Sequence, residues 1–388
     1  MMNIKSTITY KKIHAFLYRL NLIFKFLSDT KYLKLPEVEL TNNGFILISH
    51  ESNRKGASIL VDSIAKELRD KGADVFIISR QFGELNKEYS RIVKLRVVFS
   101  KCTLLKTVHY LSQKGYNKVI VNTVMNGDIV PALNKEKLQV VSLIHETVTA
   151  IDMLLAQKEL KNILEFSNVV CFPTNLLKQD IEKAYGFDCS KVNILPQGLY
   201  LKTDDNNINC EKSNSVLCVG STNHAKGFDL FIKLASLLPD DIVMNWVGKR
   251  DTFFDRIVKE YGGKLPGNFK YLGQLSNDEL LDVYRKSKVY ALMSRFDTFP
   301  SVMLEAMNTG TPVIGFKCSG GIVELVVNMK NGYLIENIDN LQEFAYRITQ
   351  FIDMPCNQYK DISQICRSTA SSYSFDSYVG KIIKLSGN

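Results

Sequence analysis

The sequence predicts an α/β protein built from two successive domains, each a parallel β-sheet covered by helices on both faces. The chain has 388 residues, enough for two domains at roughly 100–200 residues each. Short, continuous apolar runs alternate with longer segments of helical periodicity, which is typical of doubly wound sheets. The alternation stops at the polar, turn-prone segment 199–213 and then begins again, so this segment is the predicted linker.

The first 43 residues are expected to form a basic, amphipathic extension. Residues 1–34 contain seven basic side chains and one acidic one, whereas the whole chain carries a formal net charge of +9. A nucleic-acid-binding protein would carry its charge more evenly. Between residues 11 and 27, apolar side chains recur at helical spacing, but Arg19 and Lys25 disfavour a membrane span. This helix can lie on an anionic membrane surface or, slightly favoured because it is commoner, pack against the protein's own body.

The first doubly wound domain is expected to span residues 44–198. Its predicted strands are 45–49, 75–78, 96–99, 118–122, 139–144, 169–172 and 192–195. Ligands of open parallel sheets bind in the loops that follow the strands. Here these loops include Gly56 and Ala57 at a helix start, and His145-Glu146 after the fifth strand. Each signal is weak alone, since a histidine in such a place is more often structural than catalytic.

The second doubly wound domain is expected to span residues 214–370, and a C-terminal helix at 371–388 is expected to return to the first domain. Its predicted strands are 216–219, 242–247, 269–272, 289–293 and 312–316. Ser276 and Glu279 have the spacing of a capping box at the start of a helix. Two such domains facing each other would form a cleft lined by the loops after their strands.

The loop 294–301 has the richest chemistry. Pro300 suits the first position of a helix, and the free N–H groups of a helix N-terminus suit a phosphate. Glu305, in the second turn, can hold a diol such as that of ribose by two hydrogen bonds, and Asp297 lies on the loop itself. Alternatively, Asp297 and Ser301 only cap the helix and Glu305 lies on the surface. The residues of this loop alone leave both open.

A second loop, 220–227, follows strand 216–219 and opens a predicted helix at 228–238. It has neither the spacing of a dinucleotide-binding loop nor that of a P-loop. Lys226 at a helix N-terminus is electrostatically unfavourable unless it binds an anion, so it is a candidate diphosphate ligand, or else a solvated surface lysine. In a third loop, Gly320 and Gly321 permit a close backbone approach to a ligand, or form a plain tight turn.

Taken together, these motifs resemble a known family. Its donor-site signature is matched by the run Asp297…Glu305-Ala306-Met307…Gly310-Thr311-Pro312-Val313…Gly320-Gly321…Glu324, and its diphosphate loop by Val219-Gly220 with Lys226-Gly227. The family is that of retaining glycosyltransferases with the GT-B architecture, most similar to family four. The segments 46–51, with Gly56-Ala57, and 195–200 are similar to a branch of bacterial polysaccharide enzymes. The resemblance covers about residues 44–380 and implies two Rossmann-like domains facing a cleft.

The resemblance implies a role for each matching position. Glu305 would bind the nucleotide ribose, Lys226 and Gly220 the diphosphate, and Asp297 would stabilise charge near the donor sugar. The remaining implied contacts are Thr298, Phe299 and Pro300 with the sugar, Gly56 and Ala57 with the diphosphate, and His145 with the transferred sugar. The implied catalytic set is thus Asp297, His145 and Lys226, without a metal. Asp297 replaces a commoner glutamate and Ser221 the usual arginine, for which Arg250 or Arg295 could substitute.

The sequence therefore predicts an enzyme that moves a sugar from a UDP- or GDP-sugar to a glycan or lipid-linked acceptor, with retention and without a metal or other cofactor. Cell-surface polysaccharide biosynthesis is the expected process. The expected location is the cytoplasm, with a peripheral membrane contact through residues 11–27 and no nucleic-acid partner. The alternatives are a nucleotide-sugar epimerase and a non-catalytic partner that binds a nucleotide sugar or glycan.

Overall fold

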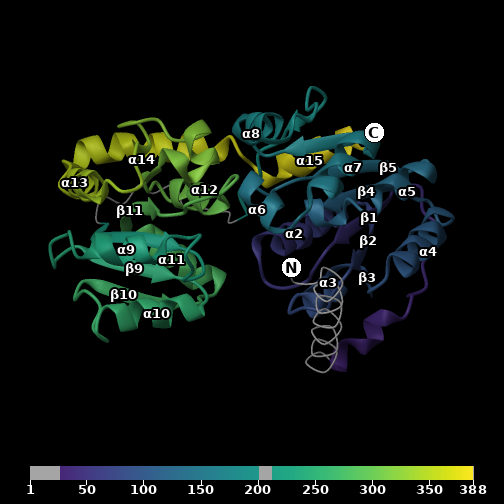
Figure 1. Ribbon diagram of the computed structural model, residues 1–388, viewed down its shortest axis with the longest axis horizontal. Helices are drawn as coiled ribbons and strands as arrows, with labels where there is room; N and C mark the ends of the chain where they lie inside the picture. The colour runs from purple at the N-terminus through teal and green to yellow at the C-terminus, as the bar shows by residue number, and fades with distance from the viewer. Residues whose placement is uncertain (1–26, 201–211, 388) are drawn as a thin grey trace, which may run out of the picture. The chain divides into compact units, whose positions relative to one another are not determined.

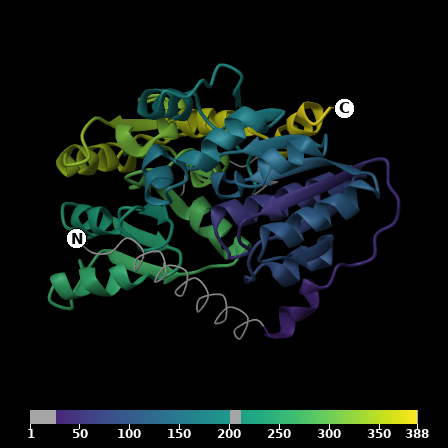
Figure 2. The ribbon, with the colours of Figure 1, turned by 45° about the vertical axis from the view of Figure 1, so that its right-hand side comes forward.

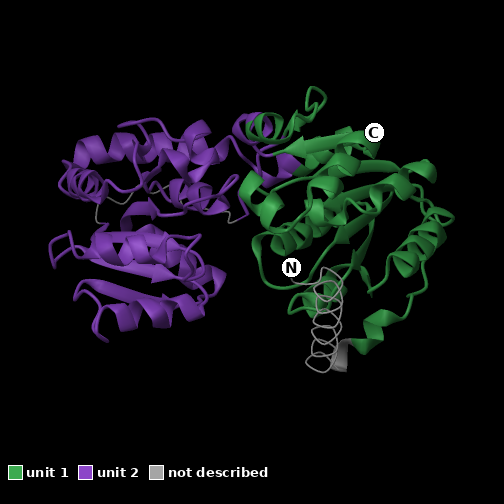
Figure 3. Cartoon of the chain, in the orientation of Figure 1, with its two compact units in different colours: residues 1–172, 180–194, 379–388 green, residues 173–179, 195–378 purple. Residues whose placement is uncertain are grey.

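The computed structural model describes residues 27–200 and 212–387, which form two compact units (Figures 1 and 3). Unit 1 takes the described residues up to Phe172, then Asp180–Ile194 and the residues from Val379 onward, and unit 2 takes Pro173–Gln179 and Leu195–Tyr378. The predicted helix within residues 11–27 and most of the predicted linker 199–213 lie outside the described residues.

Unit 1 contains a seven-stranded sheet in the order β3-β2-β1-β4-β5-β6-β7, in which every pair is parallel. The strands are β1 (Gly44–Ser49), β2 (Asp74–Ser79), β3 (Lys94–Val97), β4 (Tyr116–Asn122), β5 (Gln139–Leu143), β6 (Val169–Phe172) and β7 (Asn193–Ile194). The α-helices are α2 (Gly56–Asp70), α3 (Asn86–Ile92), α4 (Lys101–Ser112), α5 (Val130–Lys135), α6 (Val148–Met153) and α7 (Gln157–Phe166), with short 3-10 helices η1 (Leu27–Leu33) and η2 (Val124–Asn126). Helix α8 (Asn175–Tyr185) has residues in both units.

Unit 2 contains a six-stranded parallel sheet in the order β10-β9-β8-β11-β12-β13. The strands are β8 (Ser213–Val219), β9 (Val243–Val247), β10 (Phe269–Gly273), β11 (Ser287–Leu292), β12 (Val313–Phe316) and β13 (Gly332–Ile335). The α-helices are α9 (Phe228–Ala235), α10 (Thr252–Glu260), α11 (Asn277–Lys286), α12 (Ser301–Asn308), α13 (Leu341–Ile352), α14 (Cys356–Ser371) and α15 (Phe375–Leu385), with η3 (Lys317–Ser319) and η4 (Gly321–Glu324). From Val379 onward α15 belongs to unit 1.

The apolar pattern explains both sheets. All six residues of β1 are buried, and α2 buries the side chains of Leu60, Ile64 and Leu68, which recur at four-residue spacing. Figure 1 and, turned by 45°, Figure 2 show helices packed alongside the strands of each unit. The predicted parallel-sheet α/β architecture is therefore confirmed for both units.

Some details differ from the prediction. Strand β3 lies at Lys94–Val97 rather than 96–99, α9 ends at Ala235 rather than 238, and β13 was not predicted. Strand β13 has only four residues and begins with a glycine, which weakens the strand signal of the three residues that follow. Gly332 is needed because a Cβ atom there would lie 1.9 Å from the carbonyl oxygen of Val313. The capping box of Ser276 and Glu279 is present at the start of α11.

No helix within residues 27–200 and 212–387 is long and apolar enough to cross a membrane.

Candidate functional site

Both sheets have a point where the strand order reverses, next to their first strand. In unit 2 this point lies between β8 and β11, which are hydrogen-bonded neighbours. The chain leaves these two strands through the loops 220–227 and 293–300. In open α/β sheets, ligands bind at the carboxyl ends of the strands beside such a switch point. The two loops that were singled out in the sequence therefore meet where the topology favours a ligand.

Lys226 and Asp297 form an ion pair across this switch point. The Nζ atom of Lys226 lies 2.5 Å from Oδ2 of Asp297, although the residues are 71 positions apart. Burial lowers the pKa of Lys226, but the adjacent Asp297 carboxylate outweighs it and raises the pKa overall, so the lysine stays charged. The Lys226 side chain passes over Gly220, where an added Cβ atom would lie 3.2 Å from its Cγ. Three predicted site residues thus meet at one place.

Asp297 is therefore not a helix cap. Helix α12 begins at Ser301, with Pro300 at the N-cap position rather than at the first helical position. Within the described part of the chain, no side chain caps α12 or α9, whose N-cap is Gly227. Both helices begin beside the switch point. Their first backbone N–H groups and positive dipole ends are suited to an anion.

Glu305 is buried, with 9% of its surface exposed, so the alternative of a surface position is wrong. The Tyr284 hydroxyl donates a hydrogen bond of 2.9 Å to its Oε2 atom. Burial raises the pKa of Glu305 to about 7, and the Tyr284 hydrogen bond opposes this rise only in part. Burial and the negative charges of Glu305 and Asp297 together raise the pKa of Tyr290, so both carboxylates act on one buried phenol. Glu305 is therefore a buried carboxyl group of α12, the helix that follows the loop of Asp297.

The paired glycines shape this site from a third loop. A Cβ atom on Gly320 would lie 1.7 Å from the carbonyl oxygen of Asp297, and one on Gly321 would lie 2.1 Å from that of Thr298. Gly320 also has a φ of 83°, which favours glycine. The close approach that the sequence indicated is thus made to the neighbouring loop. Phe299 is buried behind that loop, with its ring centroid 5.7 Å from that of Tyr373.

The two arginines considered as substitutes at the Ser221 position already have carboxylate partners. Arg295 makes a bidentate ion pair with Asp229, at 2.8 and 2.7 Å, and donates to the carbonyl oxygen of His224 at 2.6 Å. Burial raises the pKa of Asp229, but the hydrogen bonds and charge of Arg295 outweigh it and lower the pKa overall. Arg250 pairs with Asp255 and lies over the ring of Phe254. Arg295 therefore acts as a brace between the loop 293–300 and α9.

One further contact holds the start of the loop 220–227. The indole Nε1 of Trp246 in β9 donates a hydrogen bond of 2.8 Å to the carbonyl oxygen of Gly220. Trp246 is fully buried and packs edge-to-face on Phe228 and Phe231 of α9. The backbone of Gly220 is therefore fixed by the core of unit 2.

In unit 1, the predicted residues also lie at the carboxyl ends of strands. Gly56 opens α2, where an added Cβ atom would meet nothing within 4 Å, and the carbonyl oxygen of Ala57 accepts a hydrogen bond from Asn122 at the end of β4. His145 follows β5, and burial lowers its pKa to about 4, so its imidazole is neutral at pH 7. Gly56 and Ala57 therefore lie beside the switch point between β1 and β4, and His145 follows the next strand of the sheet.

Sequence reasoning missed the polar residues at this second switch point. His50 contacts the Thr123 hydroxyl through Nδ1 at 3.1 Å and Glu51 through Nε2 at 3.4 Å. Burial raises the pKa of Glu51, but hydrogen bonds from His50 and Asn53 and the charge of Lys55 lower it to about 2. Thr123 has a φ of 75°, a conformation that costs a non-glycine residue free energy. Their place directly after strands 45–49 and 118–122 was the available signal.

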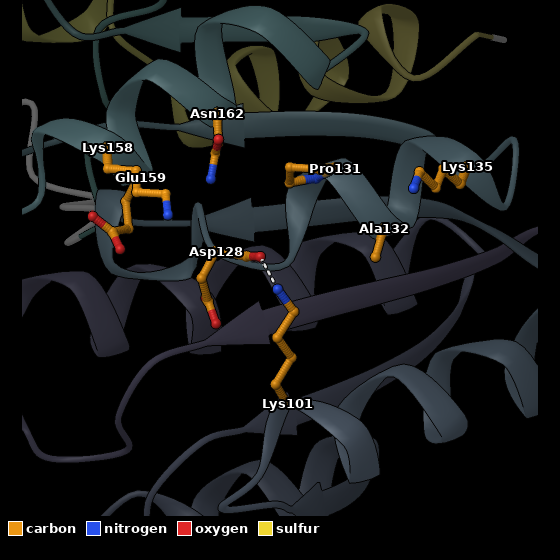
Figure 4. A pocket seen from close by; sticks show the side chains of 8 residues that line it. All are labelled: Lys101, Asp128, Pro131, Ala132, Lys135, Lys158, Glu159 and Asn162. Atoms are coloured by element: carbon orange, nitrogen blue, oxygen red, sulfur yellow. Dashed lines mark hydrogen bonds between the residues drawn. The ribbon is translucent and has the colours of Figure 1, made fainter. Parts of the chain in front are cut away.

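A cavity of about 360 Å³ in unit 1 is separate from these residues (Figure 4). Lys101 of α4 reaches the carbonyl oxygen of Asp128 across it, and residues of α5 and α7 form its other walls. Among the described residues, the cavity is lined by Lys101, Asp128, Pro131, Ala132, Lys135, Lys158, Glu159 and Asn162. None of these is a predicted site residue.

Comparisons with known proteins agree with the geometry. Residues 202–369 match the model of the family described as "Glycosyl transferases group 1". An uncharacterized glycosyltransferase of Haemophilus influenzae is 28% identical over 43% of this chain, and the match spans 47% of that relative, less than half its length. The amylovoran biosynthesis glycosyltransferase AmsD of Erwinia amylovora is 24% identical over 79% of this chain and 89% of its own length.

Solved structures show the same fold. The Anabaena protein Alr3699/HepE, in complex with UDP-glucose, superposes with a TM-score of 0.73 at 17% identity, covering 88% of this chain and 98% of that one. WaaG, a glycosyltransferase involved in lipopolysaccharide biosynthesis, superposes with a TM-score of 0.67 at 15% identity over 89% of this chain and 100% of its own. Residues 202–369 therefore match the group 1 glycosyl transferase family, and the parallel-sheet fold of the chain is that of GT-B glycosyltransferase structures.

Proposed function

We propose that this chain transfers a sugar from a UDP- or GDP-sugar to a glycan or lipid-linked acceptor, with retention of the anomeric configuration, in cell-surface polysaccharide biosynthesis. The observation that carries the proposal is the Lys226–Asp297 ion pair at the switch point of unit 2, beside two helix N-termini without side-chain caps in the described structure. A structural neighbour that holds UDP-glucose supports a nucleotide-sugar donor, and the relative named for amylovoran biosynthesis supports a polysaccharide product.

Lys226 is the proposed ligand of the donor diphosphate. Its ammonium group stays charged and faces the carboxylate of Asp297. An arriving diphosphate can replace this carboxylate as the partner of the lysine. The first N–H groups of α9 and α12 would add fixed donors that need no rearrangement during the reaction. Arg295 and Arg250 already have carboxylate partners. We therefore infer that the N–H groups of the two helices stabilise the phosphate charge that the family arginine would neutralise.

Glu305 is the proposed ligand of the nucleotide ribose. A carboxylate accepts hydrogen bonds from both hydroxyls of a diol, and burial strengthens these bonds by excluding water. Tyr284 occupies Oε2 from one side, and among the described residues Oε1 has no protein hydrogen-bond partner. In unit 1, Gly56 and Ala57 are the proposed contacts of the diphosphate, and His145 is the proposed contact of the transferred sugar.

The proposed reaction breaks the bond between the anomeric carbon and the diphosphate oxygen, and the electron pair leaves with the diphosphate. Lys226 and the helix N-termini stabilise the negative charge that develops there, while Asp297 stabilises the positive charge on the oxocarbenium-like sugar. The acceptor hydroxyl attacks the same face, and its proton passes to the departing phosphate. His145, neutral at pH 7, can accept a hydrogen bond from that hydroxyl. No covalent nucleophile is assigned.

Lysine and helix dipoles are proposed to serve in place of a metal ion. If so, turnover should be unchanged by a chelator such as EDTA and should not rise when Mg²⁺ or Mn²⁺ is added. Loss of activity in EDTA, restored by either cation, would contradict this part of the proposal.

We propose that the chain acts in the cytoplasm, at the inner face of the membrane, through the basic segment 11–27. Vesicles that contain an anionic lipid should then bind the full chain, and neutral vesicles should not. Replacing Lys11, Lys12, Arg19 and Lys25 by glutamine should abolish the binding.

The central test combines donor binding and turnover. A thermal-shift panel of UDP- and GDP-sugars identifies the donor, and release of free nucleotide is then measured with and without a lipid-linked acceptor. A transferase releases nucleotide mainly when acceptor is present. Conversion of one nucleotide sugar to another without acceptor would instead show an epimerase, and binding with neither reaction would show a non-catalytic partner.

A further inference from the structure

The surroundings of Glu305 differ from those of the other charged groups at the switch point. Lys226 and Arg295 each have an opposite charge as a partner, whereas the polar group that contacts Glu305 is the neutral phenol of Tyr284. Burial and the charge of Glu305 also raise the pKa values of two further phenols, Tyr200 and Tyr290. Glu305 is thus a buried carboxyl group among tyrosines from α11, β11 and residue 200.

The position of Tyr284 is fixed by its packing. Its side chain is fully buried in α11, and its ring centroid lies 6.0 Å from that of Tyr290. From this position its hydroxyl is 2.9 Å from Oε2 of Glu305 and 3.5 Å from the carbonyl oxygen of Val302, so the single hydroxyl proton is best directed at the carboxyl group. Tyr284 therefore selects one orientation of Glu305 and leaves Oε1 on the other side.

A carboxyl group in this setting does not carry a full charge without a ligand. Burial disfavours the ionised form, and one neutral hydrogen bond compensates only in part, which places the pKa of Glu305 at about 7. A ribose diol would donate two more hydrogen bonds to the ionised form and so favour it. The ligand itself would then complete the set of donors that the carboxylate needs.

We propose that Tyr284 is a positioning residue for Glu305, and that a nucleotide sugar binds Glu305 in its ionised form and displaces a proton from this carboxyl group. The inference rests on the proposed function, in which Glu305 binds the ribose. It makes donor affinity depend on pH through a single group. Below about pH 7 the proton must leave before the diol binds, so affinity falls as pH falls. Above that pH, affinity is constant. Between pH 8 and pH 6 the dissociation constant should rise about tenfold.

Calorimetry measures this proton directly. UDP-glucose, or the donor identified by the thermal-shift panel, is titrated into the full chain in two buffers that differ in ionisation enthalpy. A sugar nucleotide is a suitable probe because its diphosphate has no free terminal phosphate that titrates near neutrality. At pH 6.5 binding should release about three quarters of a proton, and at pH 8.5 almost none, as the fraction of protonated Glu305 requires.

Two tyrosine variants separate positioning from general stability. Tyr284→Phe removes the hydrogen bond that favours ionised Glu305, so the pH at which proton release is half-maximal should move upward by about one unit and affinity at pH 7 should fall. Tyr359→Phe is the matched control. Tyr359 is equally buried, and its hydroxyl donates to the carbonyl oxygen of Lys288 at 2.8 Å rather than to Glu305. Its proton-release profile should coincide with that of the original chain.

The outcomes separate this inference from the proposed function. If no nucleotide sugar binds at any pH, the proposed function fails. If binding occurs without proton release at pH 6.5, only the link between binding and Glu305 ionisation is wrong. If Tyr284→Phe and Tyr359→Phe have the same profile as the original chain, Tyr284 does not position Glu305.

Discussion

Arg295 and Asp229 join the loop after β11 to the first turn of α9 by two parallel hydrogen bonds of 2.8 and 2.7 Å. Asp229 is thereby held ionised, and the Arg295 guanidinium is engaged by Asp229 and by the carbonyl oxygen of His224. The residue type at position 295 therefore bears on the spacing of the Lys226 and Asp297 loops rather than on anion binding.

Arg295→Lys should therefore destabilise the fold and weaken donor binding. Lysine keeps the charge but cannot form both hydrogen bonds, so the free energy of unfolding should fall by about 1–3 kcal/mol. Urea denaturation and donor titration measure the two effects. Arg256→Lys is the control, because Arg256 and Glu260 form an exposed pair whose contribution should be near zero. Equal effects of the two substitutions would show that the Arg295 brace has no special role.

Lys226 and Asp297 should respond differently to substitution although they touch. Lys226→Met should abolish measurable donor binding, because it removes the charge that faces the diphosphate. Asp297→Asn should lower turnover by about 10²–10³, with a much smaller change in donor affinity, because its charge is needed most in the transition state. Isothermal titration and steady-state rates separate these effects. Lys233→Met, on the exposed side of α9, should change neither. An Asp297→Asn chain with normal turnover would refute the role assigned to Asp297.

Glu305→Gln should make the protein more stable at pH 8 while weakening donor binding. The folded-state pKa of about 7 exceeds the ordinary value of 4.5, so the folded chain binds more protons between these values and its stability falls as pH rises through this window. Glutamine lacks this cost, and the gain at pH 8 should be about 2–3 kcal/mol. Denaturation at pH 4.5 and pH 8 tests the sign. A gain of the same size at both pH values would mean that the cost is not one of ionisation.

Gly320→Ala should distort the neighbouring loop that carries Asp297. The new Cβ atom would overlap the carbonyl oxygen of Asp297, and the positive φ is unfavourable for alanine, so we expect a loss of about 2–4 kcal/mol and a lower turnover. Gly267→Ala is the matched control, because an added Cβ atom there meets nothing within 4 Å and its stability should change by less than about 0.5 kcal/mol. Thermal unfolding and turnover, measured on both variants, give the comparison. A stable, fully active Gly320→Ala chain would contradict the packing described for this loop.

The sequence predicted the helices and strands of this fold better than the side-chain pairs that connect them. Continuous apolar runs and helical spacing are local properties, so the parallel strands of both units were found, except for the short, glycine-led β13. Lys226, Asp297 and Glu305 were found because each lies directly after a strand or at a helix start. The pairing of Arg295 with Asp229 and of Tyr284 with Glu305 was not found, because these partners are 66 and 21 positions apart and come together only through packing. Tyr284 looked like any other residue of an apolar helix face.

The hydrogen bond from Trp246 to Gly220 also gives the protein an intrinsic optical reporter. The chain contains a single tryptophan, and its indole N–H is bonded to the first residue of the loop that carries Lys226. Any shift of that loop when a ligand arrives would alter the environment of this one fluorophore. Emission from the unlabelled protein would then follow occupancy of unit 2 in real time, without interference from a second indole.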